Sequence, residues 1–152
     1  STFLEDTLRR IQIGIGAGEE DYYKAIAGSF LLSADNAHAV HPNHPEKSDE
    51  NNRPFLNGGL VLKFSANQKY TTGGKSAAFV KKLCKSAGVT PQVFANRSDM
   101  AGGSTLGNIS NAHVSLTSAD VGLPQLAMHS ALETMGTHDL SDMVAMMKEL
   151  YK

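Results

Sequence analysis

Two segments of this sequence end an apolar run with a side chain that can bind zinc. Asp35 directly follows the run that ends at Ala34, and His129 follows Leu126-Ala127-Met128. A carboxylate oxygen and an imidazole nitrogen are both common zinc ligands. The residues alone leave simpler interpretations open, because Asp35 can cap a turn and His129 can be a hydrogen-bonded core histidine.

A second group of possible ligands is the histidine repeat His38, His41 and His44. The spacing of three residues suggests a metal-binding cluster on one face of a helix. Pro42 and Pro45 interrupt any such helix, so the spacing does not bring the three rings onto one face. Weak metal binding by this loop is therefore kept as an alternative hypothesis.

Two glycine-rich segments resemble nucleotide-binding motifs without matching them. Gly73-Gly74-Lys75-Ser76 has the end of a phosphate-binding loop, but Lys69 stands where the first glycine of that motif is required. The segment 14–18 lacks the third glycine of the dinucleotide fingerprint, which would fall at Glu19. We therefore expect no nucleotide site in this chain.

The composition fits one ordinary globular domain. The chain has 152 residues, of which 41% are hydrophobic, and 14 basic side chains balance 15 acidic ones. This balance gives no basic surface for nucleic acid or an anionic membrane, so neither partner is expected. No apolar run approaches the ~20 residues that a membrane-spanning helix needs. We expect a soluble, cytoplasmic protein.

Cys84 and the position of Ser1 support two further expectations. Cys84 lies on the apolar side of a predicted helix, where a small buried side chain is more common than a nucleophile. One cysteine cannot form an intrachain disulfide, which suits a reducing cytoplasm. The chain starts at Ser1, already inside a predicted helix, which suggests that it is a piece of a longer protein.

The spacing of apolar residues predicts alternating helices and strands. Thr2-x-x-Glu5 has the spacing of a capping box at the start of the first helix, and Gly88 stands where a helix would end. The stretch 41–59 lacks periodicity and predicts a long loop. Helices are predicted over 2–13, 19–28, 74–87 and 140–151, and strands over 29–34, 60–64, 92–95 and 113–116. This alternation indicates an α/β fold with a mostly parallel or mixed sheet.

Four ordered segments resemble the signature of a known family. One of them reads Asp-Val-Gly-Leu-Pro-Gln-Leu-Ala-Met-His-Ser-Ala-Leu-Glu, and the first contains Ser-Ala-Asp-Asn-Ala-His-Ala. They resemble segments of the aspartyl aminopeptidase family, the M18 metallopeptidases, in the form typical of bacterial members. The four segments are Ser33–Asn43, Lys63–Tyr70, Asn96–Gly107 and Asp120–Glu133. The resemblance implies part of a three-layer α/β/α sandwich, as in dinuclear zinc exopeptidases.

The resemblance also implies a metal site. The family has two metal ions, usually zinc with cobalt or manganese as alternatives, which share a bridging aspartate and a water molecule. Such a pair polarises the peptide carbonyl and activates water near neutral pH. Asp35 matches a terminal ligand of one metal, and His129 matches the histidine ligand of the other.

Four more residues match positions that the family places near its substrate. His38 and Lys63 fall beside the substrate, where a lysine would neutralise the acidic side chain of an N-terminal Asp or Glu. Gly103 and Ser104 belong to a turn that would present backbone N–H groups and a hydroxyl. These roles, like the preference for acidic residues, are implied by the resemblance.

Several functional groups of the family have no match in this chain. They are an upstream histidine ligand, the bridging aspartate, a glutamate ligand and the catalytic glutamate. Glu19-Glu20 is not the family's glutamate pair, because it follows the first predicted helix instead of preceding it. The inserted domain that builds the family's large assemblies also lies upstream. Residues 1–152 therefore resemble the C-terminal part of the catalytic domain, with no catalytic residue of their own.

Three hypotheses follow for the chain. It is one half of a nicked enzyme still bound to its N-terminal half, a self-associating fragment without activity, or a binding module that loads metal weakly through its histidine loop. The parent protein is expected to be a homo-oligomeric aminopeptidase acting on peptides. Intact-mass spectrometry under denaturing conditions separates a two-chain enzyme from a single species at 16.2 kDa.

Overall fold

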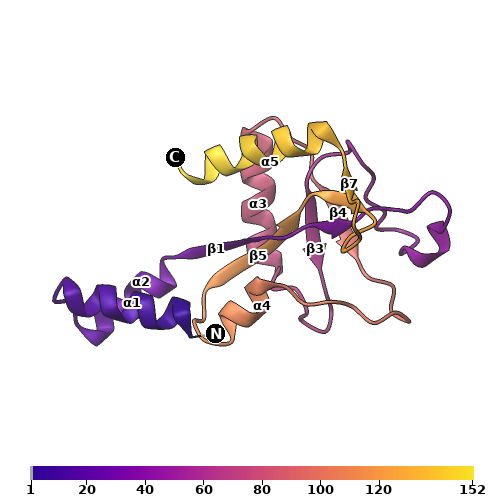
Figure 1. Cartoon of the computed structure of the whole chain (residues 1–152). Coiled ribbons are helices and arrows are strands. Elements are labelled where there is room, and N and C mark those ends of the chain that lie inside the picture. Colours follow the sequence, from indigo (N-terminus) through magenta and orange to yellow (C-terminus); the bar gives the residue numbers. More distant parts are fainter. Residues whose placement is uncertain (1) are drawn as a thin grey trace.

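The computed structural model describes residues 2–152. Helices and strands alternate along the chain, as the sequence predicts (Figure 1). The elements are α1 (Phe3–Gly14), α2 (Glu19–Ala27), β1 (Phe30–Ala34), β2 (Ala37–His38), the short 3-10 helix η1 (Pro45–Lys47), β3 (Val61–Phe64), α3 (Gly74–Ser86), β4 (Gln92–Ala95), α4 (Leu106–Asn111), β5 (Thr117–Gly122), β6 (Pro124–Leu126), β7 (Thr134–Met135) and α5 (Thr137–Leu150).

The central sheet has four strands in the order β1-β5-β3-β4. β1 runs parallel to β5 and β3 runs parallel to β4, whereas β3 and β5 are antiparallel. The sheet is therefore mixed, which confirms the prediction. β2, β6 and β7 form a second small sheet, in which β2 and β6 extend the β1–β5 pair beyond Asp35.

One face of the central sheet carries the main hydrophobic core. Alternate residues of β3 and β5, such as Leu62 and Val121, point to this face and are fully buried. Helices α3 and α5 cover it and pack against each other (Figure 1). Val80 of α3 and Met146 of α5 are both fully buried in this core. Burying these side chains stabilises the sheet by roughly 1.5–3 kcal/mol for each large apolar residue.

The opposite face combines a small apolar cluster around Val61 and Phe94 with buried polar residues, and α4 covers its β1–β5 part. Ser33 and Asp120 lie side by side on β1 and β5 and are both buried. The backbone N–H of Gly107 donates to the Ser33 hydroxyl at 3.1 Å. A Cβ at Gly107 would come within 2.7 Å of the Ser33 side chain, so only glycine lets α4 approach so closely. Helices on both sides of a sheet give the three layers expected.

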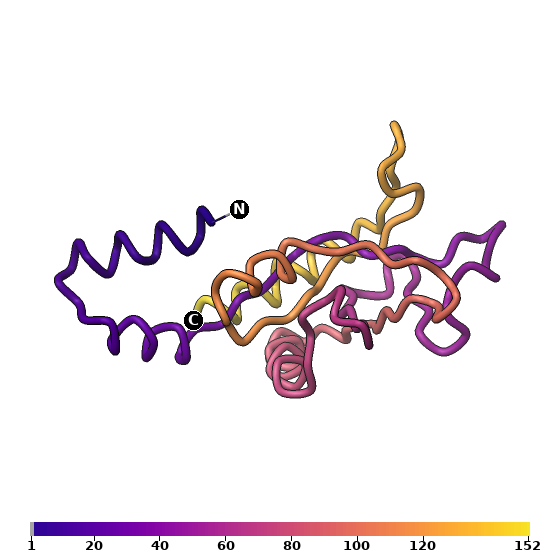
Figure 2. Tube along the Cα trace, turned by 90° about the horizontal axis from the view of Figure 1, so that it is seen from below, coloured from indigo at the N-terminus to yellow at the C-terminus, as the bar shows by residue number. Residues whose placement is uncertain are grey.

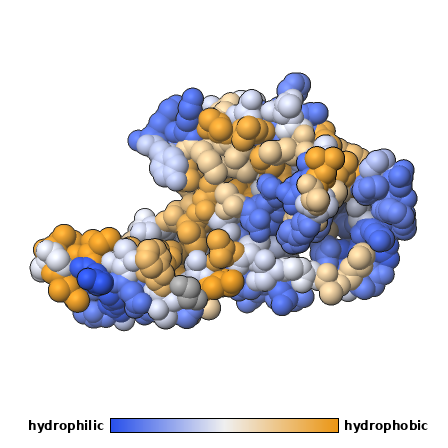
Figure 3. Space-filling model, viewed as in Figure 1, coloured by the Kyte–Doolittle hydropathy of each residue, from blue (hydrophilic) through white to orange (hydrophobic). Residues whose placement is uncertain are grey.

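The first two helices project beyond the sheet at the start of β1 (Figures 1 and 2). α1 buries no residue, and Ile13 and Ile15 are 76% and 74% exposed. Arg9 joins the two helices, because its guanidinium lies 3.6 Å from the centre of the Tyr22 ring and pairs with Glu19 at 2.8 Å. Apolar side chains gather on the projecting helices in Figure 3. This face lacks the cover that helices normally have.

Two predictions about local structure are wrong. The capping box at Thr2 does not form; its hydroxyl donates to Asp6 at 2.7 Å instead. The predicted strand over 113–116 is a turn, since His113 and Val114 both donate backbone hydrogen bonds to Ser110. The strand follows at β5, and α4, β6 and β7 are short elements that the periodicity did not indicate.

Other local predictions are confirmed. Gly88 ends α3 with a φ of +71°, the left-handed conformation that favours glycine at this position. Gly73 lies just before α3 and serves as its N-terminal cap, not as part of a phosphate loop. None of the helices in residues 2–152 has both the length and the apolar content to cross a membrane.

Candidate active site

All six residues singled out from the sequence line one pocket of about 140 Å³. We call it the first pocket. These six residues come from four separate segments, namely β1–β2, β3, the loop before α4 and the turn after β6. The six are Asp35, His38, Lys63, Gly103, Ser104 and His129.

Asp35 is held at the point where β1 passes into β2. Its backbone N–H donates to the carbonyl of Val121 at 3.0 Å, which continues the β1–β5 pairing by one residue. Gly122 permits this crossing, because a Cβ there would come within 1.9 Å of the Asp35 carbonyl oxygen. The Asp35 side chain itself is exposed at the pocket.

His129 lies in a tight turn with an unusual backbone. Its φ is +67° and that of Ala127 is +55°, a conformation that costs energy for residues other than glycine. The carboxylate of Glu133 accepts the His129 backbone N–H at 2.6 Å, and this hydrogen bond lowers the pKa of Glu133. Glu133 thus fixes the turn that carries the imidazole. Its place in the quoted motif was visible in the sequence, but its role was not.

The donor set at this pocket fits part of a zinc site. Asp35 offers carboxylate oxygens and His129 an imidazole nitrogen, which are ordinary zinc ligands. Among residues 2–152 no group of three or more His, Cys, Asp or Glu side chains is arranged to hold a metal ion. The two residues can therefore contribute to a zinc site but cannot complete one.

Lys63 brings a buried positive charge to the pocket. It is 3% exposed, and its Nζ donates to the carbonyl of Asn36 at 3.0 Å. The same Nζ lies 4.6 Å from the centre of the Tyr70 ring. Burial lowers the pKa of Lys63, while the charges of Asp35 and Asp120 oppose that shift. A buried ammonium with one carbonyl partner is well suited to pair with an anion.

Asp120 is a buried carboxylate behind the pocket that sequence reasoning did not assign. One of its oxygens accepts the backbone N–H and the hydroxyl of Thr71 at 2.6 and 2.9 Å. The other accepts the Thr105 hydroxyl at 2.6 Å, and its own N–H donates to Thr72 at 2.8 Å. Asp120 therefore ties the loop after β3 to the loop before α4. An aspartate inside an apolar strand was the available signal, because such a group must be hydrogen-bonded.

The turn at Gly103 and Ser104 is exposed at the pocket opening. The Ser104 hydroxyl accepts a hydrogen bond from Asn108 at 3.1 Å. A Cβ at Gly103 would meet no atom within 4 Å, so residues 2–152 impose no steric need for glycine there. The predicted presentation of backbone N–H groups to a substrate stays a prediction.

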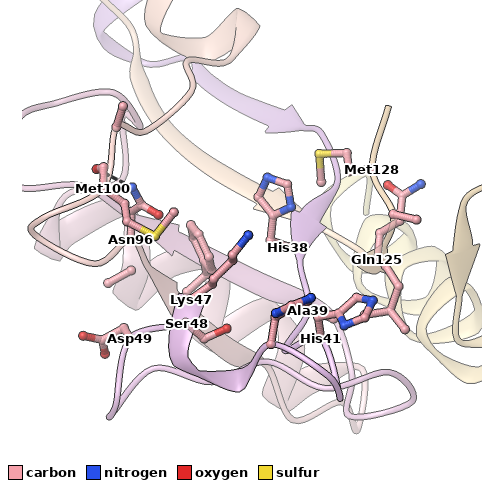
Figure 4. Close-up of a pocket in the computed structure, with 16 residues that line it drawn as sticks. His38, Ala39, His41, Lys47, Ser48, Asp49, Asn96, Met100, Gln125 and Met128 are labelled. Atoms are coloured by element: carbon pink, nitrogen blue, oxygen red, sulfur yellow. Dashed lines mark hydrogen bonds between the residues drawn. The ribbon is translucent and has the colours of Figure 1, made fainter. Parts of the chain in front are cut away.

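Within residues 2–152 the three loop histidines are not arranged as a metal-binding group. His41 and His44 lie with ring centres 5.5 Å apart, but neither lines the first pocket with Asp35. Partial removal of the His38 ring from water, together with the charges of Lys63 and His129, lowers the pKa of His38. All three histidines instead line a larger neighbouring pocket (Figure 4).

Two further buried groups are Gln125, which lines the neighbouring pocket, and Cys84, which lies in the main core. Gln125 on β6 contributes to lowering the pKa of Glu133, while its Oε1 accepts no hydrogen bond from the described residues. Cys84 is fully buried on α3, and burial raises the pKa of its thiol to about 11. Its burial confirms that Cys84 is a core residue.

Residues 1–151 match the family model described as aminopeptidase I zinc metalloprotease (M18). The chain belongs to this family.

Curated relatives agree with this assignment. A probable M18 family aminopeptidase 2 from Clostridium acetobutylicum is 48% identical over 139 residues, and one from Pseudomonas aeruginosa is 45% identical over 149 residues. These alignments cover 91% and 98% of this chain but 32% and 34% of the relatives. The chain spans about a third of the length of the curated relatives it matches.

Solved structures agree on the fold. A chain of the Ape4 and Nbr1 complex matches 99% of this chain with a TM-score of 0.92 and 38% identity, over 29% of its own length. The M18 aminopeptidase from Thermotoga maritima matches 98% with a TM-score of 0.82 and 27% identity, over 35% of its length. The mApe1 structure from S. cerevisiae, a dodecamer, matches 83% with a TM-score of 0.73 and 28% identity, over 27% of its length.

Proposed function

We propose that residues 1–152 form the C-terminal part of the catalytic domain of an aminopeptidase that removes N-terminal residues, preferably Asp or Glu, from peptides. The observation that carries the proposal is the meeting of Asp35, His129 and the buried Lys63 at one pocket. Because the family is described as zinc metalloproteases, we interpret this combination of residues as part of a zinc site.

In this proposal Asp35 and His129 each hold one of two zinc ions, with cobalt or manganese as alternatives. Bound zinc polarises the peptide carbonyl and makes a water molecule more acidic. Lys63 pairs with the acidic side chain of the N-terminal residue. His38 lines the same space, and Gly103 and Ser104 orient the substrate through backbone N–H groups and a hydroxyl.

The remaining ligands and the catalytic glutamate would come from the upstream half of the parent protein's catalytic domain. Two ligands from this chain support that division, because a zinc site needs at least three protein ligands. The isolated chain is then inactive. The dodecamer of S. cerevisiae mApe1 supports a homo-oligomeric parent, and a single buried cysteine fits a cytoplasmic one.

The test uses the full-length protein that contains this chain. Release of Asp or Glu from short peptides is measured with zinc content before and after the changes Asp35→Asn and His129→Ala. We expect about two zinc ions per site in the parent, and loss of both tight zinc binding and cleavage in the variants. His113→Ala, an exposed histidine distant in sequence from the ligands, is the control. Unchanged zinc content in both site variants would contradict the proposal.

The second candidate is a non-catalytic, self-associating chain, which the exposed apolar residues of α1 favour. Intact-mass spectrometry of the natural protein distinguishes the two. A species much heavier than 16.2 kDa, or a second polypeptide, supports the aminopeptidase. A single 16.2 kDa chain without zinc supports the alternative.

A further inference from the structure

A larger pocket of about 370 Å³ adjoins the first one, and Figure 4 shows the residues that line it. We call it the second pocket. The two are continuous, because five residues line both of them. The shared residues are His38, Phe94, Asn96, Ala101 and Met128. A molecule bound in the first pocket can therefore extend into the second without leaving the protein surface.

The second pocket presents basic side chains. His38, His41, His44 and Lys47 line it, and Asp49 is the one acidic residue among its lining residues. In Figure 4 the Lys47 amine and the His38 ring point toward each other across the cavity. His44 pairs with Glu46 at 3.2 Å, whereas His38, His41 and Lys47 have no salt-bridge partner among residues 2–152.

Asp49, the acidic residue of the second pocket, already has hydrogen-bond partners. The Asp49 carboxylate accepts the backbone N–H groups of Asn51 and Asn52 at 3.0 and 2.8 Å, and the side chain of Asn52 at 2.8 Å. Figure 4 shows it directed away from Lys47. It therefore does not neutralise the basic groups, and an external anion can pair with them.

A backbone hydrogen bond fixes one nitrogen of the His41 ring. Its Nδ1 accepts the backbone N–H of Asn43 at 3.2 Å. When the ring is neutral, the proton is then on Nε2, which becomes a donor. Apolar side chains, among them Phe94 and Met100, supply the rest of the lining and suit the methylene groups of an amino-acid side chain.

We propose that the second pocket binds a carboxylate carried by the second residue of the substrate, on the leaving side of the bond that is cut. This rests on the proposed function, in which the first pocket holds the N-terminal residue. Consecutive residues of an extended chain are about 3.3–3.6 Å apart, which suits two pockets with common lining residues. The carboxylate belongs either to an Asp or Glu side chain or to the free C-terminus of a dipeptide.

Three substrates test the inference on the full-length protein. Asp-Ala carries a C-terminal carboxylate, Asp-Asp-amide carries one on the second side chain, and Asp-Ala-amide carries neither. We expect kcat/KM for at least one of the first two to exceed that for Asp-Ala-amide by about tenfold, the effect of one charge-assisted hydrogen bond. A gain with Asp-Ala alone identifies the C-terminal carboxylate, and a gain with Asp-Asp-amide identifies the side chain.

The variants Lys47→Met and His41→Gln assign the preference to this pocket. In each we expect the ratio of kcat/KM between the carboxylate substrate and Asp-Ala-amide to fall toward one, and Lys47→Arg to restore it. Lys75→Met, which removes an exposed lysine at the start of α3, is the matched control and keeps the ratio.

The outcomes separate this inference from the proposed function. If all three peptides are cleaved with equal kcat/KM, or if the ratio survives Lys47→Met and His41→Gln together, the second pocket does not bind the carboxylate and the aminopeptidase assignment stands. If none of the three is cleaved by zinc-loaded protein, both are overturned.

Discussion

The carboxylate of Asp120 accepts a hydrogen bond from the hydroxyl of Thr105 at 2.6 Å, and both residues are buried. The other oxygen of Asp120 is bonded to Thr71, on the loop that follows β3. One side chain on β5 thus fixes two loops that border the first pocket. Its charge also opposes the lowering of the pKa of Lys63 by burial.

We expect Asp120→Ala to impair catalysis as well as stability. The change leaves the Thr71 backbone N–H without its acceptor, which costs about 1–3 kcal/mol of unfolding free energy. The freed loops also no longer hold Ser104 and Tyr70, the ring beside the Lys63 amine, in place, so kcat/KM falls for acidic substrates. Urea unfolding and peptide cleavage by the full-length protein measure the two effects.

Asp139 supplies a matched control for that prediction. It is equally buried, and its carboxylate accepts the backbone N–H groups of Asn57 and Gly59 at 2.8 and 2.9 Å. It lines neither pocket of the site. Asp139→Ala should lose similar stability and keep its kcat/KM below the unfolding transition. Equal loss of kcat/KM in both variants would show that Asp120 acts through stability alone.

Glu133→Ala should weaken zinc binding without removing a ligand. Glu133 accepts the His129 backbone N–H and stabilises a turn with positive φ, so its loss lets the imidazole move. Outer partners of metal ligands typically affect metal affinity by about 10–100-fold. Competition with a chelator measures this. Glu149→Ala, near the end of α5 and paired with Lys152, should leave the zinc affinity unchanged, and an unaltered affinity in Glu133→Ala would refute the role.

The thiol of Cys84 makes stability depend on alkaline pH. Its pKa is raised to about 11 in the folded chain, whereas an unfolded thiol titrates near about 8.5. The folded state therefore holds its proton longer, and stability is lost as pH rises through this window. We expect the urea midpoint to fall less steeply between these pH values in Cys84→Ala than in the parent. Identical slopes would contradict burial of the thiol.

The same burial predicts slow chemistry at Cys84. The thiolate is the reactive form, and it is scarce at pH 8 in the folded chain. Alkylation followed by mass spectrometry should be slow in buffer and rapid in concentrated urea. Fast modification in buffer would show that α3 opens readily.

Exposed apolar residues on α1 predict self-association of the isolated chain. Ile13 and Ile15 are about three-quarters exposed, and α1 has no buried residue. Ile13→Glu with Ile15→Glu should shift the chain toward the monomer in size-exclusion chromatography. Leu132→Glu removes a similarly exposed residue, at 81%, outside these helices and should have less effect. Equal effects would place the contact elsewhere.

Much of the fold could be predicted because it depends on local patterns. The apolar spacing in 74–87 and 140–151 matches α3 and α5 closely, and Gly88 ends α3 as its conformational freedom predicts. The strand over 92–95 matches β4. In these segments the spacing of apolar residues that are close in sequence shows which side of each helix or strand is buried.

β5 could not be predicted in the same way. Ser118 and Asp120 interrupt its apolar pattern, yet both are buried because Asn111, Thr71 and Thr105 satisfy them from other segments. Val114, by contrast, has the appearance of a strand residue and is buried within a turn. For Ser118 and Asp120, side chains from other segments supply the hydrogen bonds that allow burial.

The sequence by itself determined which residues have metal-binding chemistry and, through four ordered motifs, which family they resemble. Only the tertiary structure decided that Asp35, Lys63 and His129 line one pocket, and that Asp120 and Glu133 hold the loops around it. The physical reason is distance along the chain. The spacing within a motif shows which residues are neighbours on one helix or strand. The pocket depends instead on sheet pairing and on buried hydrogen bonds between segments far apart in sequence.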